Sequence, residues 1–392
     1  MMVALAVAFQ AATYGILMYS FTFWVDPWMT EFETNRSRVM AVISAHTIAM
    51  GIAAVFLGRW IDRIKARLAL TIGLICLCCG LAIISIVNNI WLIMAVYVVI
   101  MPFAAVFAGP LMAMSLIARN VRSRQGLAFG ITSMGTSIGG VAFPFIVTSL
   151  TTSIGWRETH LWLAVAIALL LIPIGWIILS FEQYEPRKST STAAQSRSET
   201  LSIIKTRHFW ILSVSYFAIA LVFSGLQFNL RPFASDLGLT VEQTAMIASS
   251  IALAMVVGKL GTGLLMDHFD NRVLFAGGAT LLAGAVTLIM LGASFESMIV
   301  GFSLLGAGSG AFLPLKGALF SQAFGAASIG RAMGLAQPII TLYALSPLLG
   351  GWLRDATGSY APFLIIVLGV SLLTIPLIIA GPNSRRPRPA IQ

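Results

Sequence analysis

Two lysines stand inside long apolar segments, where a positive charge needs a specific partner. Lys259 lies in the apolar run 242–265, and Lys316 lies in the run 297–324. A lysine at the centre of a membrane helix costs about 2.5–3.5 kcal/mol on insertion scales, so water or a bound anion must accompany it. Snorkelling of either side chain to the membrane surface is the alternative. We interpret at least one lysine as a ligand-binding group, and we expect both ammonium groups to face one cavity.

The acidic residues do not provide partners for these lysines. All fourteen can be placed in loops or at helix ends: Asp26, Glu31, Glu33, Asp62, Glu158, Glu182, Glu185, Glu199, Asp236, Glu242, Asp267, Asp270, Glu296 and Asp355. The sequence also lacks a buried pair of acids, a cluster with metal-ligand spacing, and a nucleophile with a spaced His and Asp. We therefore expect no enzyme activity, no cofactor and no metal.

Other polar side chains at membrane depth are candidates for orienting a ligand. The run 209–231 carries Tyr216 and Gln227 on one helical face, and Tyr14 lies in the run 3–25. These side chains could equally make hydrogen bonds between helices. His46 in the run 38–58 is a packing residue or a group for proton coupling, because an unperturbed histidine titrates near neutral pH.

Composition identifies an integral membrane protein. Of the 392 residues, 58% are hydrophobic and 10% are charged, whereas soluble proteins carry roughly 25% charged residues. Twelve apolar runs have about the length needed to cross a bilayer. They predict helices at 3–25, 38–58, 68–87, 91–117, 126–151, 159–181, 209–231, 242–265, 273–294, 297–324, 331–353 and 360–381.

The distribution of basic residues predicts the orientation. One set of loops receives 17 of the 24 Lys and Arg residues, the opposite set receives five, and the remaining two are Lys259 and Lys316. By the positive-inside rule the first set is cytoplasmic, so both termini are expected in the cytoplasm of a multi-pass protein of the plasma (inner) membrane. The net charge of +10 therefore does not indicate nucleic-acid binding.

A ten-residue motif occurs twice at a constant offset. Gly58–Arg67 contains Asp62 and Arg63, and Gly263–Arg272 contains Asp267, with 267 − 62 = 205 and 272 − 67 = 205. The repeat divides the chain into an N-terminal half (1–181), a linker (182–208), a C-terminal half (209–381) and a tail (382–392). Duplication of this kind between apolar runs is typical of transporters.

The pattern Gly-x-x-x-Asp-Arg-x-x-x-Arg resembles the signature loop of the major facilitator superfamily. The resemblance implies an all-α polytopic fold of twelve transmembrane helices in two pseudo-symmetric six-helix halves. It also implies that the loop residues act in gating, which we expect of Asp62, Arg63, Arg67, Asp267 and Arg272. The second copy departs from the pattern at His268 and Asp270.

Shorter motifs are similar to the monocarboxylate porter group, which includes oxalate:formate antiporters. They are Tyr19–Phe21, Asn35–Arg38, Arg207–Trp210, Gly258–Lys259 and Asp355–Tyr360. That group commonly has Arg at the position of Lys259, where it meets the substrate carboxylate. Some members carry an Asp at the position of Met255, so its absence here speaks against their mode of proton coupling.

Together these features predict a secondary transporter for a small mono- or dicarboxylate. Lys259 and Lys316 would attract the anion, and Gln227, Tyr14 and Tyr216 would orient it. The expected partners are this substrate and the lipid bilayer, with the protein as a monomer. The alternatives are an efflux pump for amphipathic drugs and a membrane sensor that does not transport.

Overall fold

The computed structural model describes residues 1–61, 64–120, 125–181, 202–266, 268–292, 294–325 and 329–381. Within these ranges the chain is helical and contains no β-strand. A helix satisfies its backbone N–H and C=O groups internally, which the apolar interior of a bilayer requires. Eleven helical stretches of the described ranges are long and apolar enough to cross a membrane.

One of these stretches accounts for two crossings. Ile131–Ile178 contains 48 residues, so a straight helix would be about 72 Å long, against a hydrocarbon core of about 30 Å. Gly155 interrupts it with φ +83°, a conformation that glycine adopts without a steric penalty. The predicted twelve-helix fold is thereby confirmed, with the boundary between the fifth and sixth crossings at this glycine.

Contacts between residues divide the chain into two compact units. Unit 1 comprises Met1–Lys188, Leu226–Ala252 and Pro347–Ser359, and unit 2 comprises Ser189–Gly225, Leu253–Ser346 and Tyr360–Gln392. This division differs from the halves given by the repeat, because two segments of the C-terminal half belong to unit 1. Of the predicted linker, residues 182–201 lie outside the described residues, as does the predicted tail.

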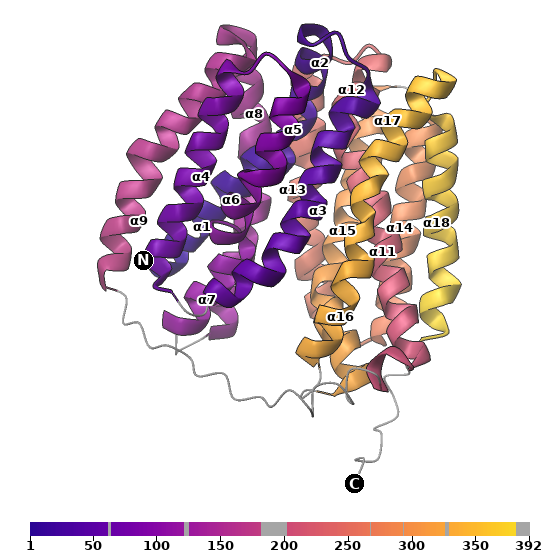
Figure 1. The fold of residues 1–392 in the computed structure, drawn as a ribbon. Helices are drawn as coiled ribbons and strands as arrows, with labels where there is room; N and C mark the ends of the chain where they lie inside the picture. Colours follow the sequence, from indigo (N-terminus) through magenta and orange to yellow (C-terminus); the bar gives the residue numbers. More distant parts are fainter. Residues whose placement is uncertain are drawn as a thin grey trace. The chain divides into compact units, whose positions relative to one another are not determined.

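All the described helices of the N-terminal half, which Figure 1 draws in indigo to magenta, lie in unit 1 together with two segments of the C-terminal half. The helices wholly in this unit are α1 (Met2–Tyr14), η1 (Gly15–Tyr19), α2 (Phe21–Glu31), α3 (Arg36–Ile61), α4 (Ala66–Ile86), α5 (Ile90–Val99), α6 (Met101–Phe107), α7 (Pro110–Asn120), α8 (Gln125–Ala166), η2 (Ile167–Leu171), α9 (Ile172–Ile178), η3 (Leu179–Phe181) and α12 (Leu230–Asp236).

Unit 2 contains the remaining membrane helices and parts of two others. It holds α14 (Asn271–Leu291), α15 (Phe295–Phe324), α16 (Ile329–Thr341), η4 (Leu342–Leu345) and α18 (Ala361–Ile379), while α11 (Arg207–Phe228), α13 (Val241–Leu265) and α17 (Ser346–Thr357) have residues in both units. Within the unit, α14 packs against α15 and α18.

Proline explains where the predicted continuous helices are broken. The predicted run 91–117 consists of α5, α6 and α7, with Pro102 in the first turn of α6 and Pro110 at the start of α7. The run 331–353 likewise consists of α16, η4 and α17, and Pro338 lies inside α16. Proline lacks a backbone N–H and fixes φ, so each of these residues removes a hydrogen bond from the helical ladder.

Glycine allows two close approaches between helices. A Cβ on Gly139 of α8 would collide with the carbonyl oxygen of Ala11 in α1. In unit 2, a Cβ on Gly258 of α13 would collide with the carbonyl oxygen of Ala307 in α15, and one on Gly310 would collide with that of Met255. Small residues at helix crossings are typical of packing inside membranes, where backbones can approach closely.

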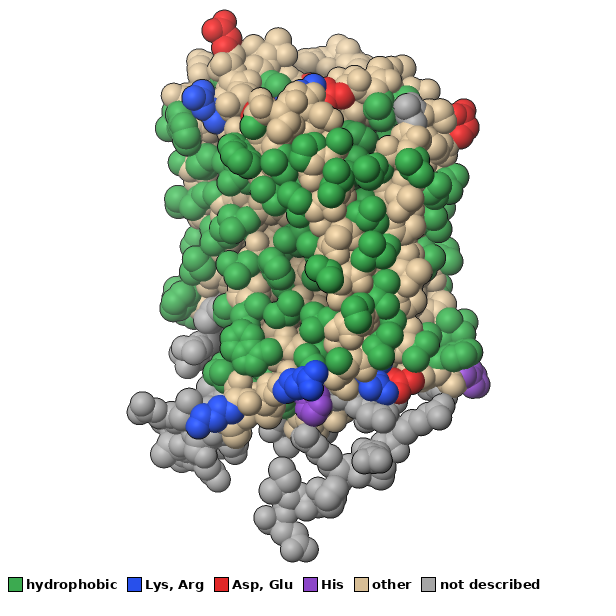
Figure 2. Space-filling model, turned by 90° about the vertical axis from the view of Figure 1, so that its right-hand side faces the viewer, with side chains coloured by type: hydrophobic (Ala, Val, Ile, Leu, Met, Phe, Trp, Pro, Cys, Tyr) green, Lys and Arg blue, Asp and Glu red, His purple; other side chains and the backbone are tan. Residues whose placement is uncertain are grey.

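Hydrophobic side chains cover the middle of the face shown in Figure 2, and charged side chains gather at its two ends. Large apolar side chains of the protein are strongly exposed, including Leu291 at 79% and Leu373 at 72%. A water-soluble surface would not carry an apolar band of this extent, so the band is the lipid-facing surface of a multi-pass membrane protein.

Candidate functional site

Lys316 lies in a polar cluster inside the membrane-spanning part of unit 2. Its ammonium group donates a hydrogen bond to Oε1 of Gln337 over 3.2 Å and lies 5.8 Å from the ring centroid of Tyr216. The cluster joins three helices, because these residues belong to α15, α16 and α11. No carboxylate lies within ion-pair distance of Lys316 in the part of the chain that the structure describes.

The neighbours of Lys316 are fixed by their own contacts. The hydroxyl of Tyr216 donates to the carbonyl oxygen of Phe312 over 3.3 Å, and its ring packs edge-on against Phe275 at 5.2 Å. Gln337 donates through Nε2 to Oγ1 of Thr341 over 3.3 Å, which turns Oε1 toward the lysine. Gln337 is exposed and Tyr216 is buried, so the cluster has one accessible side.

Sequence reasoning did not select Gln337. The available signal was a lone amide in the apolar run 331–353, directly before Pro338. Tyr216 of α11 was predicted from the sequence as a ligand-orienting residue, and the structure places its side chain beside Lys316.

Lys259 is half-buried on α13, beside the close crossing of α13 and α15. It directly follows Gly258, whereas Lys316 lies six residues beyond Gly310. The two helices are separated by one crossing and therefore run in the same direction. Both lysines then lie on the same side of the helix crossing. Along the helix axes their positions differ by five residues, which corresponds to about 8 Å. Flexible lysine stems can bridge such a separation, and the shared cavity stays a prediction.

The other predicted ligand and coupling residues belong to unit 1. Tyr14 donates to Sδ of Met50 over 3.9 Å, and Gln227 is buried at the end of α11. His46 is fully buried on α3, where Nδ1 hydrogen-bonds to the carbonyl oxygen of Tyr97 over 2.7 Å. Its Nε2 has no partner among the described residues. A role for His46 in proton coupling stays a prediction.

The repeated loop motif places its last arginine in the same kind of position in both halves. The Arg67 guanidinium, at the start of α4, lies 3.3 Å from the ring centroid of Trp176 in α9. Arg272, at the start of α14, pairs with Asp270 at 3.0 Å and donates to the carbonyl oxygens of Ile379 and Gly381 at the end of α18. Each arginine thus contacts the last membrane helix of its own half. Asp62, Arg63 and Asp267 lie outside the described residues.

A network of ion pairs occupies one end of unit 1. Asp236, at the end of α12, accepts two hydrogen bonds of 2.6 Å from Arg36 and one of 2.7 Å from Nε of Arg354. Asp26 pairs with Arg231 at 2.9 Å in the same unit. Burial acts to raise the pKa of Asp236, but the hydrogen bonds from Arg36 and Arg354 outweigh it and hold the pKa below its ordinary value.

Comparison with known proteins gives a consistent family. The family model of the Major Facilitator Superfamily matches this chain at residues 3–261 and 212–391. An uncharacterised MFS-type transporter, YcxA, of Bacillus subtilis is 24% identical over 91% of this chain and 88% of its own. Monocarboxylate transporter 12 of Mus musculus is 25% identical over 64% and 59% of the two chains, and the fujikurins efflux protein of Gibberella fujikuroi is 25% identical over 69% and 57%.

Solved structures share the fold at low sequence identity. A POT family transporter in complex with 5-aminolevulinic acid matches with a TM-score of 0.77 at 13% identity, over 96% of this chain and 94% of its own. A bacterial homologue of the human lysosomal transporter Spinster matches with a TM-score of 0.74 at 15% identity, over 96% and 95%. The twelve crossings, the duplicated loop and these matches lead to one conclusion: the chain belongs to the Major Facilitator Superfamily of transporters.

Proposed function

We propose that the protein transports a small organic anion, a mono- or dicarboxylate, across the membrane by alternating access. The observation that carries this proposal is Lys316, a cation in a membrane-spanning helix whose neighbours in the described structure are a neutral amide and a tyrosine ring. Transporters of this fold bind their substrates near the middle of the membrane. A substrate anion would supply the negative charge that the described residues do not place beside this lysine.

The chemistry of the cluster suits a carboxylate. A lysine ammonium has three donors and no acceptor, and the hydrogen bond to Gln337 uses one of them. The remaining donors can bind a carboxylate through charge-assisted hydrogen bonds, which are about twice as strong as neutral ones. In this proposal Tyr216 holds the ammonium at one side through its ring, while Gln337 orients it.

Lys259 extends the same proposal to dicarboxylates. Lys259 and Lys316 lie on the same side of the crossing of α13 and α15, and their positions along the helix axes differ by about 8 Å. A dicarboxylate would engage both lysines, and a monocarboxylate would engage one. The similarity to monocarboxylate transporter 12 supports a carboxylate substrate.

The distribution of basic residues supports the orientation. We assign the ends of α4 and α14 that carry Arg67 and Arg272 to the cytoplasm, because the loops at these ends belong to the strongly basic set. The end of unit 1 that carries Asp26, Arg231 and Asp236 would then face outward. Both termini would be cytoplasmic in a plasma-membrane protein.

Substituting Lys316 tests the proposal. In proteoliposomes, Lys316→Gln should lower uptake of labelled carboxylates at least tenfold, because the neutral amide keeps hydrogen-bonding capacity but removes the charge. Lys205→Gln is the matched control, since Lys205 is exposed and precedes α11, and it should leave uptake within twofold. Equal uptake of carboxylates by Lys316→Gln and the wild type would rule out this binding role.

Export of amphipathic molecules is the second candidate function. It is favoured by the similarity to the fujikurins efflux protein, whose name describes an exporter. The same proteoliposomes distinguish the two: transport of an uncharged amphipathic dye, unaffected by Lys316→Gln and accompanied by no carboxylate uptake, would favour the exporter.

A further inference from the structure

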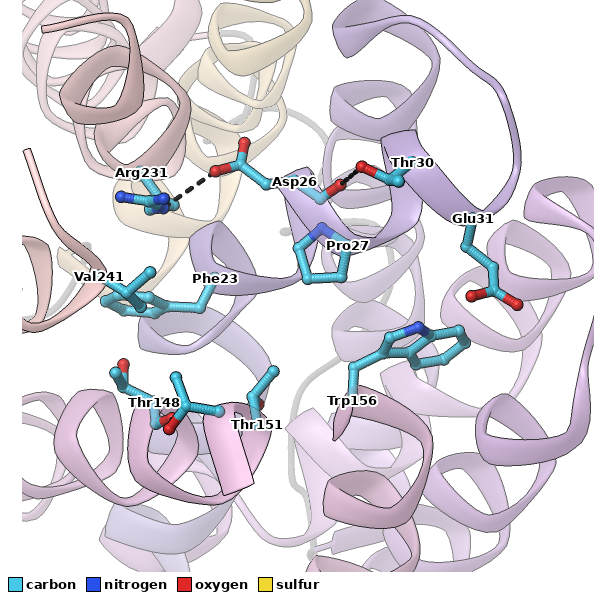
Figure 3. A pocket seen from close by; sticks show the side chains of 11 residues that line it. Phe23, Asp26, Pro27, Thr30, Glu31, Thr148, Thr151, Trp156, Arg231 and Val241 are labelled. Carbon is cyan, nitrogen blue, oxygen red and sulfur yellow. Dashed lines mark hydrogen bonds and ion pairs between the residues drawn. The ribbon is translucent and has the colours of Figure 1, made fainter. Parts of the chain in front are cut away.

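Unit 1 contains a cavity of about 430 Å³ at the end that carries Asp26 and Arg231. Its walls come from α2, α8 and α12, with Val241 at the start of α13 (Figure 3). Small-molecule sites in proteins typically have volumes of roughly 300–1,000 Å³. We call this cavity the Arg231 pocket.

The guanidinium of Arg231 is fixed in position by several groups. Its Nε lies 2.9 Å from Oδ2 of Asp26, and its Nη1 donates to the carbonyl oxygen of Leu239 over 3.0 Å and to Oγ1 of Thr244 over 3.3 Å. Its backbone N–H donates to Oγ1 of Thr22 over 2.7 Å. Among the described residues Nη2 has no hydrogen-bond partner, so the guanidinium retains donors for a further acceptor.

The wall opposite Arg231 adds hydroxyl groups. Thr148 and Thr151 of α8 line the pocket, and Figure 3 shows them on the wall across from Asp26 and Arg231. Their Oγ1 atoms are buried and have no hydrogen-bond partner among the described residues. Each hydroxyl can donate one hydrogen bond to a ligand in the cavity.

The charged side chains that line the pocket are Asp26, Glu31 and Arg231. Both acids at its edge already have an arginine: Asp26 pairs with Arg231, and Glu31 pairs with Arg157 at 3.1 Å. The hydroxyls of Thr148 and Thr151 and the unused donors of Arg231 can each donate to a further acceptor. A carboxylate supplies acceptors, and its two oxygens match the planar fork of a guanidinium.

We infer that the Arg231 pocket is an entry site, in which a substrate carboxylate takes the place of Asp26 on Arg231. This inference rests on the proposed function, since it assumes a carboxylate substrate. Asp26 belongs to the first half of the repeat and Arg231 to the second, so the exchange removes an ion pair that joins segments of both halves within unit 1. Binding of the substrate at this point thereby removes one contact between these segments.

The inference is tested by measuring the binding of labelled succinate to purified protein in equilibrium dialysis. The protein carries Lys259→Gln and Lys316→Gln, because these substitutions remove the other proposed anion site. Asp26→Asn removes the competing carboxylate and should tighten binding about tenfold, whereas Arg231→Gln should abolish it. Arg231→Lys keeps the charge without the planar fork and should bind weakly. Unchanged binding in both Asp26→Asn and Arg231→Gln would overturn the inference.

Asp236→Asn is the matched control, because it breaks the ion pairs with Arg36 and Arg354 at the same end of unit 1 but leaves Arg231 paired. It should change succinate binding by less than twofold. Equal tightening by Asp236→Asn and Asp26→Asn would show that looser packing is the cause, and would overturn the exchange. Thermal unfolding of every variant identifies those that are not folded.

The two proposals can fail separately. If the wild type transports carboxylates in a Lys316-dependent manner but binding at the second site does not depend on Arg231, the entry site is wrong and the proposed function stands. If Arg231-dependent binding is present but no carboxylate is transported, the pocket stands and the proposed function is wrong.

Discussion

At the scale of single residues, Gln337 is a neutral substitute for the anion that Lys316 would bind. Its Oε1 accepts from the ammonium over 3.2 Å, where an acid would form a permanent ion pair. A neutral partner orients the lysine and leaves its charge for a ligand. A carboxylate at this position would compensate the charge, which removes the reason for an anion to bind.

Gln337→Glu tests this difference with one nearly isosteric change. The new carboxylate should pair with Lys316, so uptake of carboxylates in proteoliposomes should fall at least tenfold. The thermal unfolding midpoint should not fall, because a charged pair replaces a half-buried lysine that has only a neutral partner. Gln337→Asn, with a shorter neutral side chain, is the control and should retain more uptake than Gln337→Glu. Undiminished uptake in Gln337→Glu would show that Lys316 is not the anion-binding group.

At the scale of elements, the arginine that ends each loop motif connects the third membrane helix of its half to the sixth. Arg67 contacts Trp176 of α9, and Arg272 contacts the end of α18. The chemistry differs, since one contact is a cation–π interaction and the other a set of hydrogen bonds to carbonyl oxygens at a helix C-terminus. The resemblance to the family motif predicted a gating role for both arginines, and the structure gives each a contact inside its own half.

Arg272→Gln should lower the stability of unit 2 by about 1–3 kcal/mol, the typical effect of losing hydrogen bonds that involve a charged group. The side chain is 19% exposed and its partner Asp270 is 11% exposed, so solvent replaces these contacts only in part. Thermal unfolding in detergent measures the loss. Arg207→Gln, at the start of α11, is a matched control with the same charge change, and a loss equal to that of Arg272→Gln would show that overall charge is responsible.

At the scale of the whole molecule, Asp236 makes the stability of unit 1 dependent on pH. Its pKa in the folded protein lies below the ordinary value of 3.8, so the bonds to Arg36 and Arg354 contribute fully above the unfolded pKa. The contribution is lost as the pH falls through the folded pKa. We therefore expect no effect of this group between pH 7 and about 5, and destabilisation below about 4.

Asp236→Asn isolates this contribution. The thermal unfolding midpoint of the wild type should exceed that of the variant at pH 7, and the difference should shrink as the pH falls below about 4. A difference that stays constant down to pH 3 would mean that the carboxylate of Asp236 is not the titrating group.

The sequence was sufficient for the fold because the bilayer imposes strong constraints on it. Apolar length gave the twelve crossings, and the constant offset of 205 residues gave the duplication. Boundaries were less predictable where proline breaks a crossing, as at Pro102 and Pro110. Hydropathy alone does not resolve short helices that follow one another within a single apolar run.

The candidate sites were predictable only in part. Lys316 was evident from its charge in an apolar run, whereas Gln337 became a candidate only through its contact with that lysine. The partners of Asp236 lie 200 and 118 residues away along the chain. Sequence reasoning placed Asp236 in a loop or at a helix end, but its pairing depends on the three-dimensional packing of helices that no local pattern encodes.

The contacts of Arg67 and Arg272 have a consequence for the order of assembly during synthesis. Trp176 is made 109 residues after Arg67 (176 − 67 = 109), and the carbonyl acceptors of Arg272 are made 107 and 109 residues after it. At roughly 5–20 residues per second, each arginine waits about 5–20 s for its partner. The first half can thus complete its own arginine contact before Arg272 is translated, and the second half repeats the same delay.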